Sequence, residues 1–175
     1  MKASSVKPAS ARRLQHLCEV EILALPKGTF MNFDQDFRAQ ITSGQPLNAA
    51  VPARFLTHRD VRVLIRPRLI IADGETGAVV EADDANTTGT GIRVELTPAG
   101  RPDGSVRLHA DMRIPARDKR GRVVISNDKT PQMNLISEDR IVQSSADTYQ
   151  CYRPESSAGA YDVFVFVKLQ TLGRP

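Results

Sequence analysis

Apolar and polar residues alternate along several stretches of the chain, and this period of two is typical of β-strands. The first stretch covers residues 18–24 and ends at a Pro-Lys-Gly turn. Residues 92–97 and 106–114 alternate in the same way on either side of an Asp-Gly turn, and Pro98 is expected to end the first of the two. Together they predict the clearest hairpin of the chain.

Further strands are indicated by runs of β-branched residues rather than by alternation. Residues 61–71 are such a run, in which Pro67 must lie at a sheet edge or a bulge because it has no N–H to donate. An Asp-Gly turn at 73–74 predicts that residues 78–82 return alongside that strand. Residues 161–169 are apolar on both faces, which predicts a strand that is covered on both sides.

The remaining apolar segments are less regular. Residues 29–43 carry three phenylalanines between polar residues, which we interpret as an amphipathic strand or an irregular hairpin. Residues 46–57 have apolar residues at roughly helical spacing and predict a short helix that ends or kinks near Pro52.

These elements predict a mainly β fold (β-rich α+β), with antiparallel hairpins in a twisted sheet or sandwich and one short helix. Residues 1–13 mix Ser, Ala, Lys, Pro and Arg without periodicity and predict a flexible basic arm. Residues 14–175 then form a single β-domain, which at this length buries a core without metals or disulfides.

Composition narrows the classes of partner. The formal net charge of +4 favours acidic partners only weakly. Tryptophan is absent and aromatic residues make up 5% of the chain, which disfavours nucleic-acid binding because single strands are held by stacking on aromatic rings. No run of about 18 apolar residues occurs, so we expect no transmembrane helix.

The two cysteines, Cys18 and Cys151, lie on predicted strands far apart in the sequence. Neither has a CxxC or CxxH neighbour, which argues against a zinc site. A disulfide across a sheet and two separate reduced thiols are both compatible with the sequence, and separate buried thiols are the commoner arrangement.

No group of residues has the spacing of a catalytic or metal site. His16, His58 and His109 lie far apart and form no HExxH or HxH pattern. The Gly-Thr-Gly sequence at 89–91 precedes a predicted strand, whereas a phosphate-binding loop precedes a helix. The sequence therefore predicts no enzyme activity, no catalytic residue, no cofactor and no metal.

Basic residues gather at two places. Residues 117–122, Arg-Asp-Lys-Arg-Gly-Arg, predict a solvated turn or a contact site for an anionic partner. A second, arginine-rich segment covers residues 54–68. The residues that we expect to contact a partner are Arg62, Arg66, Arg68, Arg117, Lys119 and Arg120.

Four segments, in this order, resemble the C-terminal β-domain of bacterial secretins, the ring-forming proteins of type II and type III secretion systems. Residues 20–22 (VEI) are similar to its opening strand, and residues 61–74 (VRVLIRPRLIIADG) to its Val-Leu-Ser-x-Pro-Arg-Leu-Val-Thr-Leu-Asp-Gly pattern. Residues 89–108 are similar to its Val-Gly-x-x-Leu-x-Val-x-Pro hairpin, and residues 163–167 to its terminal strand.

The resemblance implies a non-enzymatic structural or assembly module in the cell envelope. Its partners would be copies of itself or other protein subunits, joined sheet edge to sheet edge in a ring. The family's gate hairpin and leader peptide are not evident in the sequence, so we expect a degenerate secretin-like domain. The alternative is a cytoplasmic binding domain whose arginines between Arg54 and Arg68 contact an acidic partner or nucleic acid.

Overall fold

The computed structural model describes residues 13–81 and 91–173. The expected flexible arm at 1–13 therefore lies outside the described residues except for Arg13, and so does the segment that precedes Gly91. Within the described ranges, no helix combines the length and the apolar character needed to cross a membrane.

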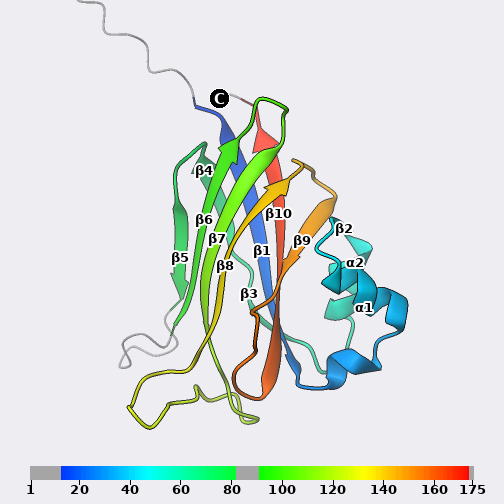
Figure 1. Cartoon of the computed structure of the whole chain (residues 1–175), viewed down its shortest axis with the longest axis vertical. Helices are drawn as coiled ribbons and strands as arrows, with labels where there is room; N and C mark the ends of the chain where they lie inside the picture. The colour runs from blue at the N-terminus through cyan, green and yellow to red at the C-terminus, as the bar shows by residue number, and fades with distance from the viewer. Residues whose placement is uncertain (1–12, 82–90, 174–175) are drawn as a thin grey trace, which may run out of the picture.

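The described residues form two antiparallel sheets (Figure 1). The first has six strands in the order β2-β9-β10-β1-β3, with β4 also paired to β1. Its strands are β1 (Gln15–Pro26), β2 (Leu47–Asn48), β3 (Arg62–Ile65), β4 (Arg68–Ala72), β9 (Thr148–Tyr152) and β10 (Tyr161–Leu172). The second has four strands, β5 (Gly77–Glu81), β6 (Ile92–Gly100), β7 (Val106–Pro115) and β8 (Met133–Val142), in that order. The predicted mainly β class is confirmed.

The main core lies between the two sheets. Alternate residues of β1 and β10 point toward the four-stranded sheet, and alternate residues of β6 and β7 point back at them. Its fully buried members include Ile22, Leu96, Leu108, Met112 and Val165. The predicted hairpin of β6 and β7 is thus confirmed, with its inner face buried in this core.

A second core lies on the other face of the six-stranded sheet. It is covered by the 3₁₀ turn η1 (Thr29–Asn32) and by two helices, α1 (Gln35–Thr42) and α2 (Ala50–Leu56). Phe164 and Phe166 of β10 point into this core, while Val163, Val165 and Val167 point into the other. The prediction of a last strand covered on both faces is confirmed.

The prediction of a strand or hairpin at residues 29–43 is wrong, because this segment forms η1 and α1. Asp34 is the N-cap of α1 and accepts a hydrogen bond from the backbone N–H of Phe37 at 2.8 Å. Phe37 and Ile41 are four residues apart and both are buried, as expected for one face of a helix. The described residues therefore contain two α-helices where the sequence predicted one.

The predicted short helix exists, but it does not end at Pro52. Pro52 is the third residue of α2, which continues to Leu56. In the first turn of a helix the backbone N–H has no intrahelical acceptor, so proline removes no hydrogen bond there.

The strand predicted at residues 78–82, of which residue 82 lies outside the described residues, does not return alongside β4. β4 pairs with β1 in one sheet, whereas β5 pairs with β6 in the other. The turn at Asp73 and Gly74 is thus a crossover between the two sheets. Hydrogen bonds from Asp73 N to Leu14 O and from Gly74 N to Pro98 O, both 2.8 Å, hold it to each sheet.

Two prolines illustrate how strand position determines tolerance. Pro67 lies between β3 and β4 and accepts a hydrogen bond from Val20 N at 3.0 Å, so the expected edge or bulge position is confirmed. Pro98 does not end its strand, since β6 continues to Gly100. β5 pairs with β6 only as far as Leu96. Beyond that point Pro98 O accepts a hydrogen bond from Gly74 N of the crossover, so the missing N–H of Pro98 breaks no strand-to-strand ladder.

Cys18 and Cys151 are both free and buried, which confirms the expectation of separate thiols. Cys18 lies in the core between the sheets, and Cys151 in the core beneath the helices. Because the two side chains are on opposite faces of the six-stranded sheet, no disulfide can join them within the chain.

Both thiols are expected to resist alkylation and aromatic disulfide reagents at pH 8 in the native protein. Burial raises the pKa of Cys18 and of Cys151 to about 12, so the reactive thiolate is scarce and shielded. Titration with a chromogenic disulfide reagent should release colour only after denaturant is added. Rapid labelling of the native protein would contradict the placement of both residues.

Candidate interaction site

Within residues 13–81 and 91–173, the four-stranded sheet has two open edges. β5 and β8 are its end strands, and each pairs on one side only. Every neighbouring pair is antiparallel, so β8 runs opposite to β5. An open edge presents unpaired N–H and C=O groups that another strand can bind.

Both open edges carry exposed aliphatic side chains on the outer face of the sheet. Val80 of β5 is 64% exposed and Leu135 of β8 is 59% exposed. The two belong to one row that crosses the sheet through Arg93 and Arg113. Ile141 is a further exposed aliphatic residue of β8. Exposed β-branched and leucine side chains at a sheet edge are typical of a contact surface.

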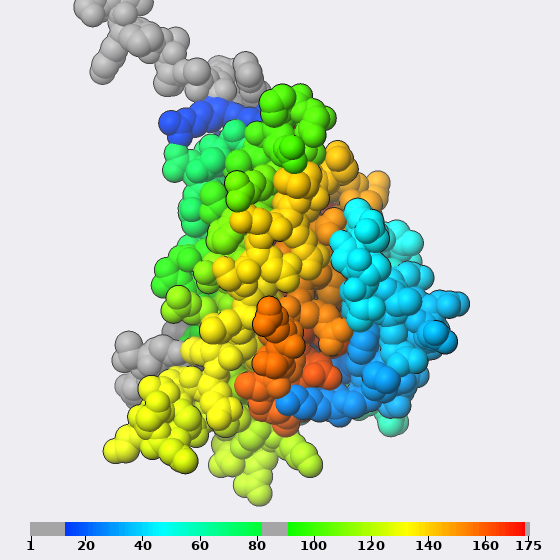
Figure 2. Space-filling view, in the orientation of Figure 1, coloured from blue at the N-terminus to red at the C-terminus, as the bar shows by residue number. Residues whose placement is uncertain are grey.

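A groove runs beside the open edge of β8. It consists of two hollows of about 310 and 380 Å³ that share Glu138, Arg153 and Glu155 as lining residues. One hollow extends to Ile41 and Thr42 of α1 and the other to the start of β8. In Figure 2 the groove lies between β8, in gold, and the orange segment that follows β9.

Two arginines, Arg140 and Arg153, hold the walls of this groove in place through contacts with the rest of the chain. Arg140 donates to Cys151 O at 2.8 Å and lies 4.2 Å from the centre of the Tyr152 ring. Its guanidinium also pairs with Glu138 at 2.7 Å. Arg153 stacks over Phe164 with 4.8 Å between the guanidinium carbon and the ring centre. The walls beside β8 are therefore held in place before any partner arrives.

The structure separates the six predicted contact residues into two groups. Arg66 and Arg68 lie next to the outer face of the six-stranded sheet, where Arg66 faces Glu21 at 3.7 Å and Arg68 faces Glu19 at 2.5 Å. The other four predicted residues, Arg62, Arg117, Lys119 and Arg120, lie together at one end of the sandwich.

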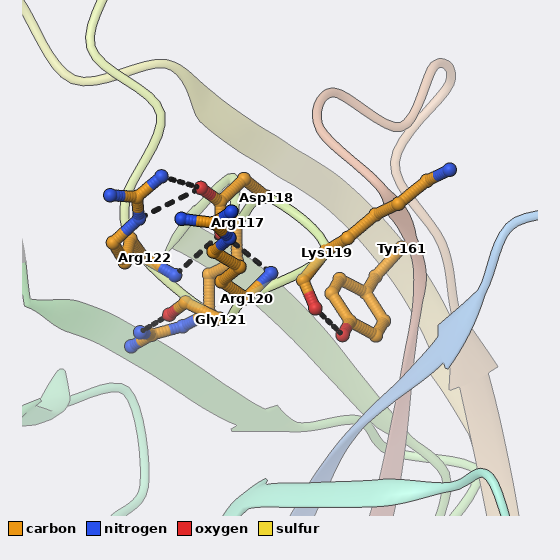
Figure 3. Close-up of polar contacts among 7 residues, drawn as sticks. All are labelled: Arg117, Asp118, Lys119, Arg120, Gly121, Arg122 and Tyr161. Atoms are coloured by element: carbon orange, nitrogen blue, oxygen red, sulfur yellow. Dashed lines mark hydrogen bonds and ion pairs between the residues drawn. The ribbon is translucent and has the colours of Figure 1, made fainter.

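The turn at residues 117–122 is tightly organised (Figure 3). Asp118 Oδ1 accepts hydrogen bonds from the backbone N–H groups of Arg120 and Arg122 at 2.8 and 3.0 Å. Arg117 donates to Gly121 O at 2.8 Å, and Gly121 has a φ of +82°, which favours glycine. The N–H of Arg122 is the largest cause that lowers the pKa of Asp118. The turn therefore presents its basic side chains from a fixed backbone.

Arg62 and Tyr161 connect this turn to the sheet. The Arg62 guanidinium lies 5.1 Å from the centre of the Tyr161 ring, and the Tyr161 hydroxyl donates to Lys119 O at 3.4 Å. Lys27 lies nearby, because its backbone N–H donates to Ala160 O at 3.0 Å. We call this region the basic end; it comprises Lys27, Arg62, Arg117, Lys119, Arg120 and Arg122.

Substituting Gly159 by alanine is expected to displace the 117–122 turn. Gly159 has a φ of +77°, and a Cβ added there would lie 2.6 Å from Arg117 O and 2.9 Å from Arg117 N. Urea unfolding should show that the free energy of unfolding falls by about 2–3 kcal/mol, because overpacking adds to the left-handed backbone strain. Gly104→Ala is the control, since Gly104 has a φ of +82° but no atom within 4 Å of the new Cβ. An equal loss in both variants would contradict the contact.

The three histidines lie apart, and the described ranges contain no group of three or more potential metal ligands. His109 lies on the outer face of β7, 3.4 Å from Asp139. His16 is fully buried, with Nε2 2.9 Å from Asp73 Oδ1 and Nδ1 3.2 Å from Thr171 Oγ1. Sequence analysis missed this cluster because its members come from three distant segments.

No family model matches the chain, and no curated protein does. Among solved structures, the chain is similar to the type II secretion secretin XcpQ from Pseudomonas aeruginosa, at 11% identity and a TM-score of 0.48. It is also similar to a chain of the Klebsiella pneumoniae type II secretion outer membrane complex of PulD, PulS and the PulC HR domain (10%, 0.49), and to the E. coli K12 secretin GspD (14%, 0.48).

These alignments cover 93–94% of this chain but only 41–60% of the other chains. The chain thus spans roughly half the length of the secretin chains that it resembles. The features of this chain that bear on its function are the open edges of β5 and β8 and its sequence motifs.

Proposed function

We propose that this chain is a structural assembly module whose copies join through the four-stranded sheet. In this arrangement β8 of one copy pairs with β5 of the next. The single observation that carries the proposal is that, in the part of the chain that the structure describes, the sheet has two open edges of opposite strand direction. Any β8–β5 contact between copies then continues the antiparallel pattern of the sheet.

The product that we propose for this contact is a closed ring. A β8–β5 contact uses two different surfaces of the chain, so it leaves one free edge at each end of a dimer. Each added copy repeats the contact until the rotation closes on itself. Closure removes every open edge of this sheet, which is the state that protects exposed strands from unspecific pairing.

The exposed aliphatic side chains support the same contact. Val80 and Leu135 lie in the same row and on the same face of the sheet. When β8 and β5 of two copies pair along that row, these side chains become cross-strand neighbours. Cross-strand aliphatic pairs contribute roughly 0.2–1 kcal/mol each. The secretin-like order of the sequence motifs supports a secretion-system ring as the product.

Multi-angle light scattering over a range of concentrations tests the proposal. We expect the unmodified chain to form a multimer of defined mass. Leu135→Lys with Ile141→Lys should weaken association at least tenfold. The two substitutions place two charged side chains on β8, at the edge where β5 of the next copy would pair. Ile70→Lys is the control, compared with each of the two β8 substitutions made singly, since Ile70 is 66% exposed but lies on β4 of the other sheet.

Two outcomes would refute the edge contact. One is an unmodified chain that remains monomeric at every concentration. The other is a loss of association in the Ile70→Lys control that equals the loss in the single β8 variants.

The alternative of an arginine surface for an acidic partner is less well supported. Arg54 pairs with Asp34 at 2.5 Å, and Arg59 faces Asp60 at 3.4 Å. With Arg66 and Arg68 also beside glutamates, four of the five arginines in residues 54–68 already face carboxylates of the chain. Less of their charge is thus available to a partner.

A further inference from the structure

The basic end concentrates positive charge that the edge contact does not use. Its six basic residues come from three separate segments: Lys27, Arg62 and residues 117–122. The acid within those segments is Asp118, while Asp60, two residues before Arg62, faces Arg59 and Asp162 follows Tyr161. Asp118 is occupied by Arg122 Nε at 3.0 Å and by two backbone N–H groups. This excess of basic residues over acids makes the region a strongly positive surface.

The charges are presented on a projecting surface. Figure 2 shows the segment between β7 and β8, coloured lime to yellow, extending from one end of the molecule. Backbone hydrogen bonds from Val124 N to Ala116 O and from Gln132 N to Val124 O hold this segment together. Neither of the two hollows beside β8 is lined by a residue of the basic end.

An aliphatic side chain accompanies the charges. Ile125 follows the 117–122 turn closely and is 49% exposed. Tyr161, the aromatic ring at the basic end, is 7% exposed and stacks against Arg62, so it offers no platform for a nucleic-acid base. Ile125 is three residues beyond Arg122 in the same projecting segment, and basic residues together with an exposed aliphatic residue match a surface of anionic headgroups over a hydrocarbon layer.

We propose that the basic end docks on the surface of a membrane rich in anionic phospholipids. The basic side chains contact the phosphates, and Ile125 enters the headgroup layer. An acidic peptide is the weaker fit, because an extended chain needs a groove or a sheet edge and the projecting turn offers neither. This inference is independent of the assembly proposal, since it uses none of the residues of the β5 and β8 edges.

Co-sedimentation with vesicles tests the docking. The full chain is mixed with vesicles of phosphatidylglycerol and phosphatidylcholine in equal parts, and with phosphatidylcholine alone, at low and high salt. We expect binding to the anionic vesicles only, and its loss at high salt. Lys119→Gln with Arg120→Gln should weaken partitioning roughly 25-fold, from about fivefold for each basic residue at an anionic surface.

Arg13→Gln with Arg101→Gln is the matched control. This variant also removes two positive charges, but both residues lie away from the basic end. Arg13 pairs with Glu75, and Arg101 lies in the turn between β6 and β7. This control should bind like the unmodified chain. Inorganic phosphate and polyglutamate serve as competitors, and neither should displace the vesicles at matched charge.

Several results would overturn the inference. They are absence of binding to anionic vesicles, equal binding to phosphatidylcholine, an equal loss in both double variants, and displacement by polyglutamate. The last would assign the surface to an acidic protein partner, and displacement by inorganic phosphate would assign it to a free anion.

Discussion

Phe55→Ala is expected to lower the free energy of unfolding by about 3–5 kcal/mol. Phe55 lies on α2, has no exposed surface and is central to the core beneath the helices. Its ring centre lies 4.8 to 6.1 Å from those of Phe30, Phe33, Phe37, Phe164 and Phe166. Alanine removes these contacts and leaves a cavity, because η1, α1 and β10 cannot all move inward together.

Urea unfolding followed by circular dichroism measures this loss. Met31→Ala is the control, because Met31 lies on η1 beside the same core but is mostly exposed. Its effect should stay within about 0.5 kcal/mol. If both variants lost the same small amount, α2 would not be packed on the six-stranded sheet.

His16→Ala should destabilise the chain by about 3 kcal/mol. The buried ring lies between Asp73 of the crossover and Thr171 of β10, so it connects β1 to both. Removing the ring leaves a cavity, and the Asp73 carboxylate loses one of its hydrogen bonds. Asp73 keeps the hydrogen bond from Gly100 N, at 2.5 Å, which limits the loss. His109→Ala, on the outer face of β7, is the control and should change little.

The contact between His16 and Asp73 also predicts how the free energy of unfolding depends on pH. The hydrogen bond from His16 is the largest cause that lowers the pKa of Asp73 below its ordinary 3.8. A lowered pKa stabilises the fold above pH 3.8, and this contribution is lost as pH falls through the lower, folded pKa. Unfolding measured from pH 6 down to pH 2 should show a smaller acid-induced loss in Asp73→Asn than in the unmodified chain. Equal losses would exclude this contribution.

The long strands could be predicted from the sequence because each has one face buried in the core between the sheets. Residues 92–97 and 106–114 alternate for that reason, and their pairing as β6 and β7 follows from the short turn that joins them. The two-faced apolar pattern of β10 likewise follows from its position between two cores.

The helical structure at residues 29–43 differs from the predicted strand, although the sequence carries a signal for it. Phe33 and Phe37 are four residues apart, and Ile41 follows after another four, which is helical spacing. Asp34 just before this run is a typical N-cap. Three closely spaced aromatic residues also suit a strand, and the competing β propensity obscured the helical period.

The crossover at Asp73 and Gly74 could not be predicted from local sequence. An Asp-Gly turn between two β-branched runs is the usual signal for a hairpin, and β4 and β5 satisfy it. What sends β5 to the other sheet is the set of contacts with Leu14, His16, Pro98 and Gly100, all distant in sequence. The meeting of Arg62 with the 117–122 turn depends on tertiary packing in the same way.

Hydrogen exchange as a function of protein concentration tests the edge contact most directly. Peptides that cover β5 and β8 are compared with peptides from β6 and β7, which have partners on both sides in the single chain. If copies join edge to edge, amides of β5 and β8 become protected as concentration rises, while those of β6 and β7 stay unchanged. Protection that appears only in the helices, or in no segment at all, would contradict assembly through these edges.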